Sequence, residues 1–429
     1  MFTGVWVDWR RRLAIFGVGL LALAGLGIGA YFLVDSLRGD GDKAQSAPAP
    51  SVVVHEQQPQ AVEELGFPAF ATKNTTRVAG VDPVADAAGV ALAVFPSTGG
   101  VDNPSAVTLV NGDDWASGIA AASLMAPPVG APILITGSDS TPSLTADALQ
   151  ALSPTGSATT GDHQVFAVGS AAAPSGLRTE RVSGGDPAEL AAAIERVRRT
   201  LSGGPPQHVL LVSSEKPEFA MPAAAWAARS GDPVLFLERD TVPKPTLDAL
   251  RRLKGVPVYA LGPPSAISDK ALAQVDKVTA TVKRIGADDP VQNAIDFARY
   301  VDGTFGWNIN DPGHGFVIAD DTRSLDAAAA SALSASGDWG PLLLTDDATQ
   351  VPAPLRSYLL DVKPGYVSDP TRAVYNHVWL IGDQHAISVG FQAQVDDLAE
   401  VAQVRSGPGP SLSARTGPPE HEPPRPSKP

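Results

Sequence analysis

The sequence predicts one N-terminal transmembrane helix followed by an α/β fold with parallel sheets. Three observations lead to this prediction: an apolar run near the N-terminus, a threefold repeat, and alternation of strand-like and helix-like segments within each repeat. The strand-like segments are apolar throughout, which is typical of parallel sheets covered on both faces by helices. The small, Ala-rich helix-like segments between them suit close packing of helices on those faces.

Composition narrows the function classes. The chain has 429 residues, of which 44% are hydrophobic and 18% charged, as in globular proteins of more than one domain. It has no cysteine, which excludes disulfides, thiolate metal sites and cysteine nucleophiles. The formal net charge of −14 argues against nucleic acid as a partner, because phosphate backbones are bound by clustered Lys and Arg.

Residues 13–34 form an unbroken run of 22 uncharged residues, long enough to span a bilayer as a helix. Arg10, Arg11 and Arg12 precede the run, so the positive-inside rule places residues 1–12 in the cytoplasm and the remainder outside the cell. A cleaved signal peptide is the alternative. The run is longer than the apolar region of a signal peptide and lacks a good cleavage site, which favours an uncleaved anchor.

Two segments are expected to lack regular structure. Residues 35–73 are polar and Pro-rich and predict a flexible stalk. Residues 406–429 consist almost entirely of Gly, Pro, Ser and charged residues and predict a disordered tail. Between them we expect three repeats, at residues 74–175, 176–277 and 278–405.

Each repeat opens with the same signals. An Arg, a Gly and an Asp-Pro pair follow one another at nearly constant spacing, beginning at Arg77, Arg181 and Arg284. Asp is a good helix N-cap and Pro is favoured at the first helical position. The pairs Asp82-Pro83, Asp186-Pro187 and Asp289-Pro290 therefore predict three helix starts.

The order of the following segments also recurs. A first strand is expected at residues 106–110, 208–212 and 315–319, and a small-residue helix at 117–125, 222–229 and 326–333. A second strand begins near Pro132, Pro233 and Pro341, which lie 101 and 108 residues apart. A third helix is expected at 144–152, 245–253 and 354–360, and a third strand ends at Gly169, Gly262 and Gly382. This order predicts Rossmann-like or flavodoxin-like modules, arranged either as a pseudo-threefold cluster or as a linear string.

The ordered series resembles the type 2 cell wall-binding repeat, found in triplicate in surface-layer proteins and autolysins of Gram-positive bacteria. The residues that carry the resemblance are Arg77-Val-Ala-Gly80, Gly130-Ala-Pro-Ile-Leu-Ile-Thr136, Gly340-Pro-Leu-Leu-Leu-Thr345, Ile381-Gly382 and Ala386-Ile-Ser388. The resemblance covers about residues 74–400. It implies non-covalent binding of an anionic secondary cell wall polymer or peptidoglycan at the extracellular side of a cell membrane.

The sequence also departs from the family pattern. Pro replaces the Arg that follows the first Asp in all three repeats. In the Phe-Pro-Asp-Ala-Leu element of the family, the first repeat has Trp115-Ala-Ser117 and the second has Phe219-Ala-Met221. Asp326, in the third repeat, keeps an acid there. If that acid contributes to ligand binding, two of the three repeats have lost it.

Candidate ligand-binding residues fall into two sets. Arg77, Arg181 and Arg284 could hold an anionic polymer, or they could be packing and salt-bridge residues. The second set comprises Asp326 and the acids that follow the first strand of each repeat, where ligands settle in open α/β sheets: Asp113, Asp114, Glu215, Asp320 and Asp321. These carboxylates could perform acid–base chemistry on a glycan or hold a bridging divalent cation such as Ca²⁺, or they could be solvated loop residues that cap the next helix.

No zinc, nucleotide-binding or serine hydrolase motif stands out, and we expect no cofactor and no catalytic residue. The expected function is therefore non-enzymatic binding of cell wall polymer by a membrane-anchored envelope protein. Two alternatives remain open: a scaffold that binds other envelope proteins, and a wall-glycan hydrolase or amidase acting through the carboxylates above. The sequence does not determine the oligomeric state.

Overall fold

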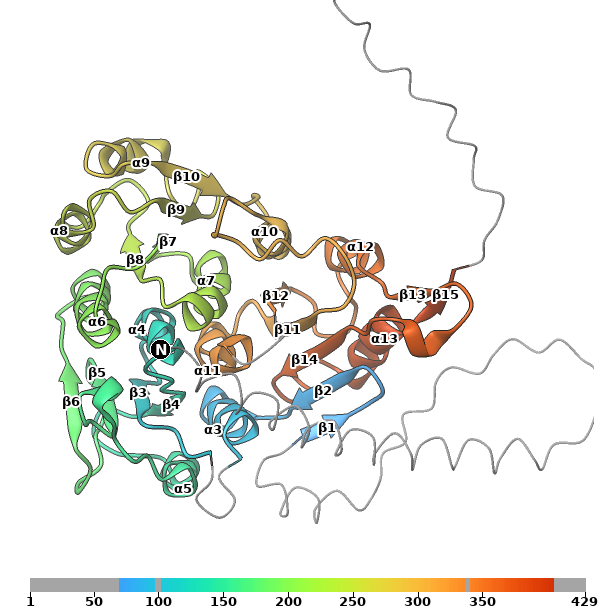
Figure 1. Ribbon diagram of the computed structural model, residues 1–429, viewed down its shortest axis with the longest axis horizontal. Coiled ribbons are helices and arrows are strands. Elements are labelled where there is room, and N and C mark those ends of the chain that lie inside the picture. Colours follow the sequence, from blue (N-terminus) through green and yellow to red (C-terminus); the bar gives the residue numbers. More distant parts are fainter. Residues whose placement is uncertain (1–68, 97–101, 336–339, 405–429) are drawn as a thin grey trace, which may run out of the picture. The chain divides into compact units, whose positions relative to one another are not determined.

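The computed structural model describes residues 69–96, 102–335 and 340–404 (Figure 1). The expected transmembrane helix at residues 13–34, the expected cytoplasmic N-terminus and the Pro-rich tail at 406–429 lie outside the described residues. Among the residues that are described, no helix is long and apolar enough to cross a membrane. The last residues of the expected flexible stalk form a strand, β1 (Ala69–Ala71), which pairs antiparallel with β2 (Thr75–Val78).

The described residues form a mixed α/β fold whose three larger sheets are parallel except for β1, as expected from the apolar strands. The first sheet has the order β4 (Ile133–Thr136), β3 (Val107–Asn111), β5 (Val165–Val168), β6 (Thr179–Val182). The second has the order β8 (Val234–Leu237), β7 (Val209–Ser213), β9 (Val258–Leu261), β10 (Val282–Ile285). The third has the order β12 (Leu342–Thr345), β11 (Gly315–Asp320), β14 (His377–Ile381), β2, β1.

The strands of one sheet do not all come from one sequence repeat. The strand that opens the second repeat, β6, joins the sheet of the first, and β10, which opens the third repeat, joins the sheet of the second. β2, which opens the first repeat, pairs with β14 near the end of the described chain. Each sheet is therefore completed by the next repeat along the chain, and the third is completed by the first.

The three Asp-Pro pairs start helices, as predicted. Asp82, Asp186 and Asp289 cap α3 (Pro83–Val94), α6 (Pro187–Ser202) and α10 (Pro290–Arg299). The Asp carboxylates accept hydrogen bonds at 2.9, 2.8 and 2.7 Å from the backbone N–H groups three residues on. These bonds satisfy N–H groups that the first turn of a helix leaves free.

The small-residue helices pack against one another. α4 (Trp115–Ala121), α7 (Pro217–Ser230) and α11 (Ser324–Ala335) contact each other in the interior, with the three sheets around them in Figure 1. Alanine permits this close approach, because short side chains let helix axes lie near each other. The same helices contribute to one continuous hydrophobic core that also includes strands of all three larger sheets.

The remaining elements complete the layers. The third helix of each repeat is α5 (Ser143–Leu152), α8 (Lys244–Arg252) or α12 (Ala353–Asp361). The Ala-Ile-Ser motifs end in N-caps, Ser268 and Ser388, of α9 (Asp269–Asp276) and α13 (Val389–Ala399). Short 3₁₀ turns lie at Ala122–Met125, Ala158–Thr160 and Pro370–Arg372, and β13 (Gly365–Tyr366) pairs with β15 (Ala402–Gln403).

Candidate functional site

The carboxyl ends of the parallel strands form the candidate site. In each larger sheet the chain runs from β3, β7 or β11 to the neighbouring strand on one side, and then to the neighbouring strand on the other side. The strand order therefore switches direction next to β3, β7 and β11. Open α/β sheets bind ligands in the crevice at such a switch point. The loops after these strands carry the acids expected from the sequence, and each set of acids belongs to a different sheet.

The three predicted arginines bind backbone carbonyl groups. Their guanidinium groups donate hydrogen bonds to the carbonyl oxygen of the glycine that ends the adjacent strand of the same sheet. The distances are 2.9 Å from Arg77 to Gly382, 2.9 Å from Arg181 to Gly169 and 2.7 Å from Arg284 to Gly262. The three contacts are equivalent: Arg181 and Arg284 tie the strand that opens a repeat to the sheet of the preceding repeat, and Arg77 ties the opening strand of the first repeat to the sheet of the third.

Arg77 is the most enclosed of the three, with 2% of its surface exposed. It also donates to the carbonyl oxygens of Asp383 at 2.9 Å and Ser388 at 3.2 Å, and to the side-chain oxygen of Gln392 at 2.9 Å. Burial lowers its pKa to about 10. Arg181 is exposed, whereas Arg284 is half-buried and also pairs with Asp269 at 2.9 Å.

The acids after β3 and β7 are tied into loops and helix starts. Asp114 caps α4 by accepting from the backbone N–H of Ser117 at 3.0 Å, while Asp113 is exposed beside it. Glu215 is exposed and accepts from the backbone N–H of Arg239 at 2.9 Å. Of these bonds, that of Asp114 caps the following helix, whereas that of Glu215 ties the loop after β7 to the loop after β8.

The acids after β11 differ from each other. Asp320 accepts hydrogen bonds from the backbone N–H of Thr322 at 2.8 Å and from its hydroxyl. Asp321 is half-buried, and burial together with the charges of Asp320 and Asp346 raises its pKa to about 6. A carboxyl group with this pKa changes its protonation state just below neutral pH.

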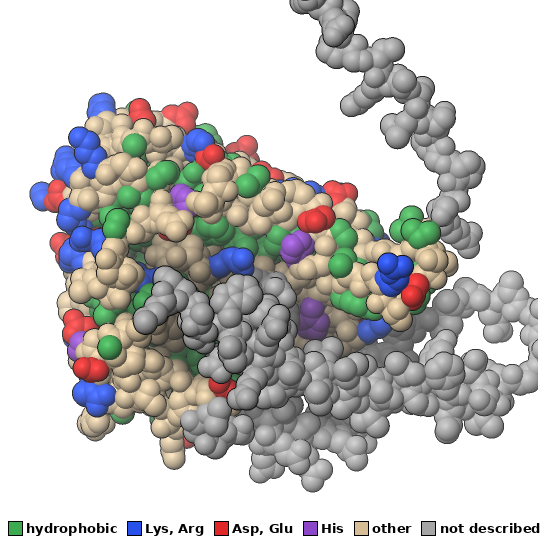
Figure 2. All heavy atoms as spheres, viewed as in Figure 1, with side chains coloured by type: hydrophobic (Ala, Val, Ile, Leu, Met, Phe, Trp, Pro, Cys, Tyr) green, Lys and Arg blue, Asp and Glu red, His purple; other side chains and the backbone are tan. Residues whose placement is uncertain are grey.

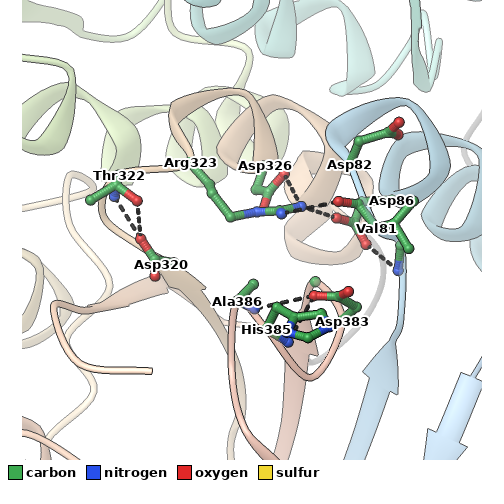
Figure 3. Close-up of polar contacts among 12 residues, drawn as sticks. Val81, Asp82, Asp86, Asp320, Thr322, Arg323, Asp326, Asp383, His385 and Ala386 are labelled. Carbon is green, nitrogen blue, oxygen red and sulfur yellow. Dashed lines mark hydrogen bonds and ion pairs between the residues drawn. The ribbon is translucent and has the colours of Figure 1, made fainter. Parts of the chain in front are cut away.

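A buried charge cluster lies between α3 and α11 (Figure 3). Asp86 and Asp326 are both 0% exposed and share one guanidinium, that of Arg323. Arg323 lies 2.8 Å from Asp86 and 2.5 Å from Asp326, and the backbone N–H of Gly80 donates to Asp86 at 2.9 Å. Burial and the second carboxylate raise the pKa of Asp86 to about 8, and burial raises that of Asp326 to about 6.

The buried cluster lies where the third repeat meets the first. The equivalent positions at the other two junctions between repeats, close to Gly169 and Gly262, carry different side chains. Near Gly169 lie Asp114, Ser117 and Leu190, and near Gly262 and Gly286 lie Phe219 and Asn293. Asn293 is 0% exposed, and within the described residues its amide has no hydrogen-bond partner. The buried pair of carboxylates around one arginine is thus found at the α3–α11 junction and not at its two counterparts.

Sequence reasoning singled out Asp326 but neither Asp86 nor Arg323. Asp86 follows the capping Asp82 by one helical turn and reads as an ordinary first-turn acid. Arg323 directly precedes α11, as Asp114 precedes α4 and Lys216 precedes α7. A charged residue just before each small-residue helix was therefore the feature of the sequence that could have pointed to Arg323.

A turn at residues 383–386 lies beside this cluster (Figure 3). Asp383 accepts from the backbone N–H groups of His385 at 2.9 Å and Ala386 at 3.1 Å (Figure 3). Within the described residues, no group of three or more His, Asp or Glu side chains could hold a metal ion. Asp114 forms a helix cap, Asp320 and Asp383 form turns, and Asp326 forms an ion pair with Arg323.

The described part of the chain is thus an α/β fold of parallel sheets around closely packed helices, with acids after the first strands and arginines that bind the ends of the third strands. Residues 181–272 match the family model of Cell wall binding domain 2 (CWB2), which confirms the resemblance to the type 2 cell wall-binding repeat. No curated protein sequence matches the chain.

Solved structures share the fold. Cwp6 from Clostridium difficile is 19% identical, with a TM-score of 0.60, over 77% of this chain and 50% of that chain. Cwp8 from Clostridium difficile is also 19% identical, with a TM-score of 0.58, over 76% of this chain and 52% of that chain. This chain thus aligns with about half the length of each of them.

Proposed function

We propose that this protein binds a cell wall polymer non-covalently at the cell surface, through three modules of the CWB2 type. The match of residues 181–272 to the CWB2 family carries this proposal. The other two modules would be residues 74–175 and 278–405, whose sheets repeat the strand order of the matched segment. Contacts among α4, α7 and α11 support a pseudo-threefold arrangement over a linear string.

The apolar run at residues 13–34 would hold the protein in the cell membrane, with the modules on the outer side. In this arrangement the polymer and the membrane are bound by different parts of one chain. The protein would then connect the cell wall to the membrane.

A sedimentation assay tests the proposal. The full chain in mild detergent is mixed with cell wall sacculi, before and after removal of phosphate-linked secondary polymers. We expect the chain to sediment with intact sacculi and to remain in solution with stripped ones. Sedimentation with neither preparation would contradict polymer binding and favour an envelope scaffold, whose protein partners should survive removal of the wall.

One observation favours catalysis as a second candidate. The pKa of Asp321 is raised to about 6 at the end of β11, where a carboxyl group could serve as a general acid. If the protein hydrolyses wall glycan, purified chain should release soluble fragments from sacculi, and Asp321→Asn should abolish the release. Wild-type protein that binds sacculi and releases no fragments would leave binding as the function.

A further inference from the structure

We propose that a basic face formed by α6 and α8 binds the phosphate groups of the wall polymer, an inference that rests on the proposed function. This α6–α8 face consists of Arg196, Arg199, Lys244, Arg251, Arg252 and Lys254. The two helices pack against each other, and Lys and Arg side chains gather at the edge of the molecule where they lie (Figure 2). Both helices lie within the segment that matches the CWB2 family.

Local charge distinguishes this face from the chain as a whole. The face carries six cations, and the acids on it and beside it are Asp186, Glu189, Glu195 and Asp248. The face therefore has an excess of two positive charges in a chain whose net charge is −14. A polyanion that approaches this face therefore meets attraction that the average charge of the protein conceals.

Two acids of the face are paired with its cations, whereas Asp186 and Glu189 at the start of α6 accept from backbone N–H groups. The Glu195 side chain is 1% exposed, and its two oxygens contact Arg199 at 2.8 Å and Arg252 at 3.4 Å. Asp248 pairs with Lys244 and, at 2.8 Å, with Arg251. Glu195 and Asp248 thus hold the basic side chains in place, while nitrogen atoms of these side chains remain available on the outside.

Two cations have no such partner. Arg196 and Lys254 are exposed, and within the described residues neither side chain forms a hydrogen bond or an ion pair. An exposed cation without an acid beside it loses no existing contact when it binds an anion. These two residues are therefore the most direct means of testing the face.

The α6–α8 face also contains a surface cavity. This cavity of about 430 Å³ lies between α6 and α8. Its lining includes the cations Arg196, Lys244 and Arg252 and the acids Asp186, Glu189 and Asp248. α8 starts after Pro243 without a side chain that caps its first N–H groups. Those N–H groups and the positive end of the helix dipole favour an anion beside the basic side chains.

The carboxyl ends of the strands attract a polyanion less strongly than the α6–α8 face does. The loops there carry Asp113, Asp114, Glu215, Asp320 and Asp321, and the arginines nearby hold backbone carbonyls. An anionic bilayer would in turn face much of the chain and its net negative charge. A single polymer strand meets only charges within a Debye length of about 8 Å, so the wall polymer fits this local basic face better than a bilayer does.

The test is the double variant Arg196→Glu/Lys254→Glu in the full chain, kept in mild detergent. Its matched control is Arg356→Glu/Arg372→Glu, which changes the net charge equally at two exposed arginines outside the face. Binding is measured by sedimentation with intact sacculi, with sacculi stripped of phosphate-linked polymers, and with vesicles of phosphatidylglycerol or phosphatidylcholine. Equal melting temperatures establish that both variants fold.

We expect the face variant to bind intact sacculi at least about tenfold more weakly than wild type, and the control to bind nearly as wild type does. If the face variant binds intact sacculi as well as the control, the inference fails while the proposed function stands. If wild type does not bind intact sacculi at all, the proposed function fails, and the inference with it. A loss confined to phosphatidylglycerol vesicles would assign the face to lipid and would also overturn the inference.

Discussion

At the scale of single residues, burial decides what each charge does. Asp86 and Asp326 are enclosed with Arg323, so two negative charges face one positive charge out of contact with water. Burying a charge without a full partner is costly, and the cost is avoided when one carboxyl group binds a proton. The raised pKa values of both groups follow from this imbalance, which Arg323 reduces but does not remove.

Protonation of Asp86 predicts a pH dependence of stability. Its pKa is about 8 in the folded chain against 3.8 for an ordinary Asp, so the folded state binds more protons than the unfolded state between these values. The contribution to stability is therefore fully present below pH 3.8 and is lost as the pH rises toward 8. We expect the melting temperature of wild type to fall between pH 6.5 and 8.5, and that of Asp86→Asn to change less.

Other titrating groups determine the pH range over which that experiment reports on Asp86. Asp321 has a pKa of about 6, and burial lowers that of His377 to about 4, so both change protonation mainly below pH 6.5. Asp321→Asn serves as the control, because it should leave the pH dependence above 6.5 as in wild type. An equal fall in melting temperature for wild type and Asp86→Asn would refute the role of Asp86.

At the scale of elements, the packed helices depend on small residues where they cross. Gly118 in α4 lies against α11: a Cβ atom added there would come within 2.9 Å of the Cβ of Ala328 and 3.2 Å of a methyl group of Leu325. Real Cβ atoms essentially never approach another atom to within 3.0 Å, and a distance of 3.2 Å is also unusually short. The glycine thus sets how near α4 and α11 can lie.

We expect Gly118→Val to lower the free energy of unfolding by about 1 to 3 kcal/mol, because it overpacks the α4–α11 contact. Intrinsic helix propensity acts in the opposite direction, since Val is a better helix former than Gly, so a loss of stability reports on packing. Urea unfolding followed by circular dichroism measures the change. Gly204→Ala, where an added Cβ meets nothing within 4 Å, should stay within about 0.5 kcal/mol of wild type.

At the scale of the whole described unit, the chain closes on itself. β2 pairs with β14, and Asn74 donates backbone and side-chain hydrogen bonds to Asp396 at 2.8 and 3.0 Å. Arg77 adds its bonds to Gly382, Asp383, Ser388 and Gln392 across more than 300 residues of sequence. Each sheet shares strands with two repeats, so a sheet cannot open without disturbing the next repeat.

Arg77→Ala tests this coupling. We expect it to cost about 3 kcal/mol, because it leaves buried carbonyl groups without a donor, whereas Arg181→Ala at the exposed counterpart should cost less than about 1 kcal/mol. Amide hydrogen exchange should then accelerate in β7 and β8, which Arg77 does not touch, as well as in β11. Faster exchange restricted to β2, β11 and β14 would show that the sheets unfold independently.

Much of the local structure could be predicted from the sequence. The Asp-Pro helix starts and the apolar strands depend on residues within a few positions of each other, and the structure has them within a few residues of the expected places. The strands β2, β6 and β10 were missed, because each is only four residues long and mixes apolar with charged or polar side chains. The roles of the candidate acids depend on burial, which residue spacing does not reveal.

The sequence by itself determined the α/β class, the repeated order of elements and the helix starts, because short-range hydrogen bonding and the pattern of apolar residues specify them. Only the tertiary structure decided which sheet each opening strand completes and that Asp86 meets Arg323, 237 residues away. It also decided that Arg77 binds backbone carbonyls in the last sheet of the chain. Such pairings arise when distant segments are buried together, and the free energy of that burial belongs to the assembled core and to no single stretch of sequence.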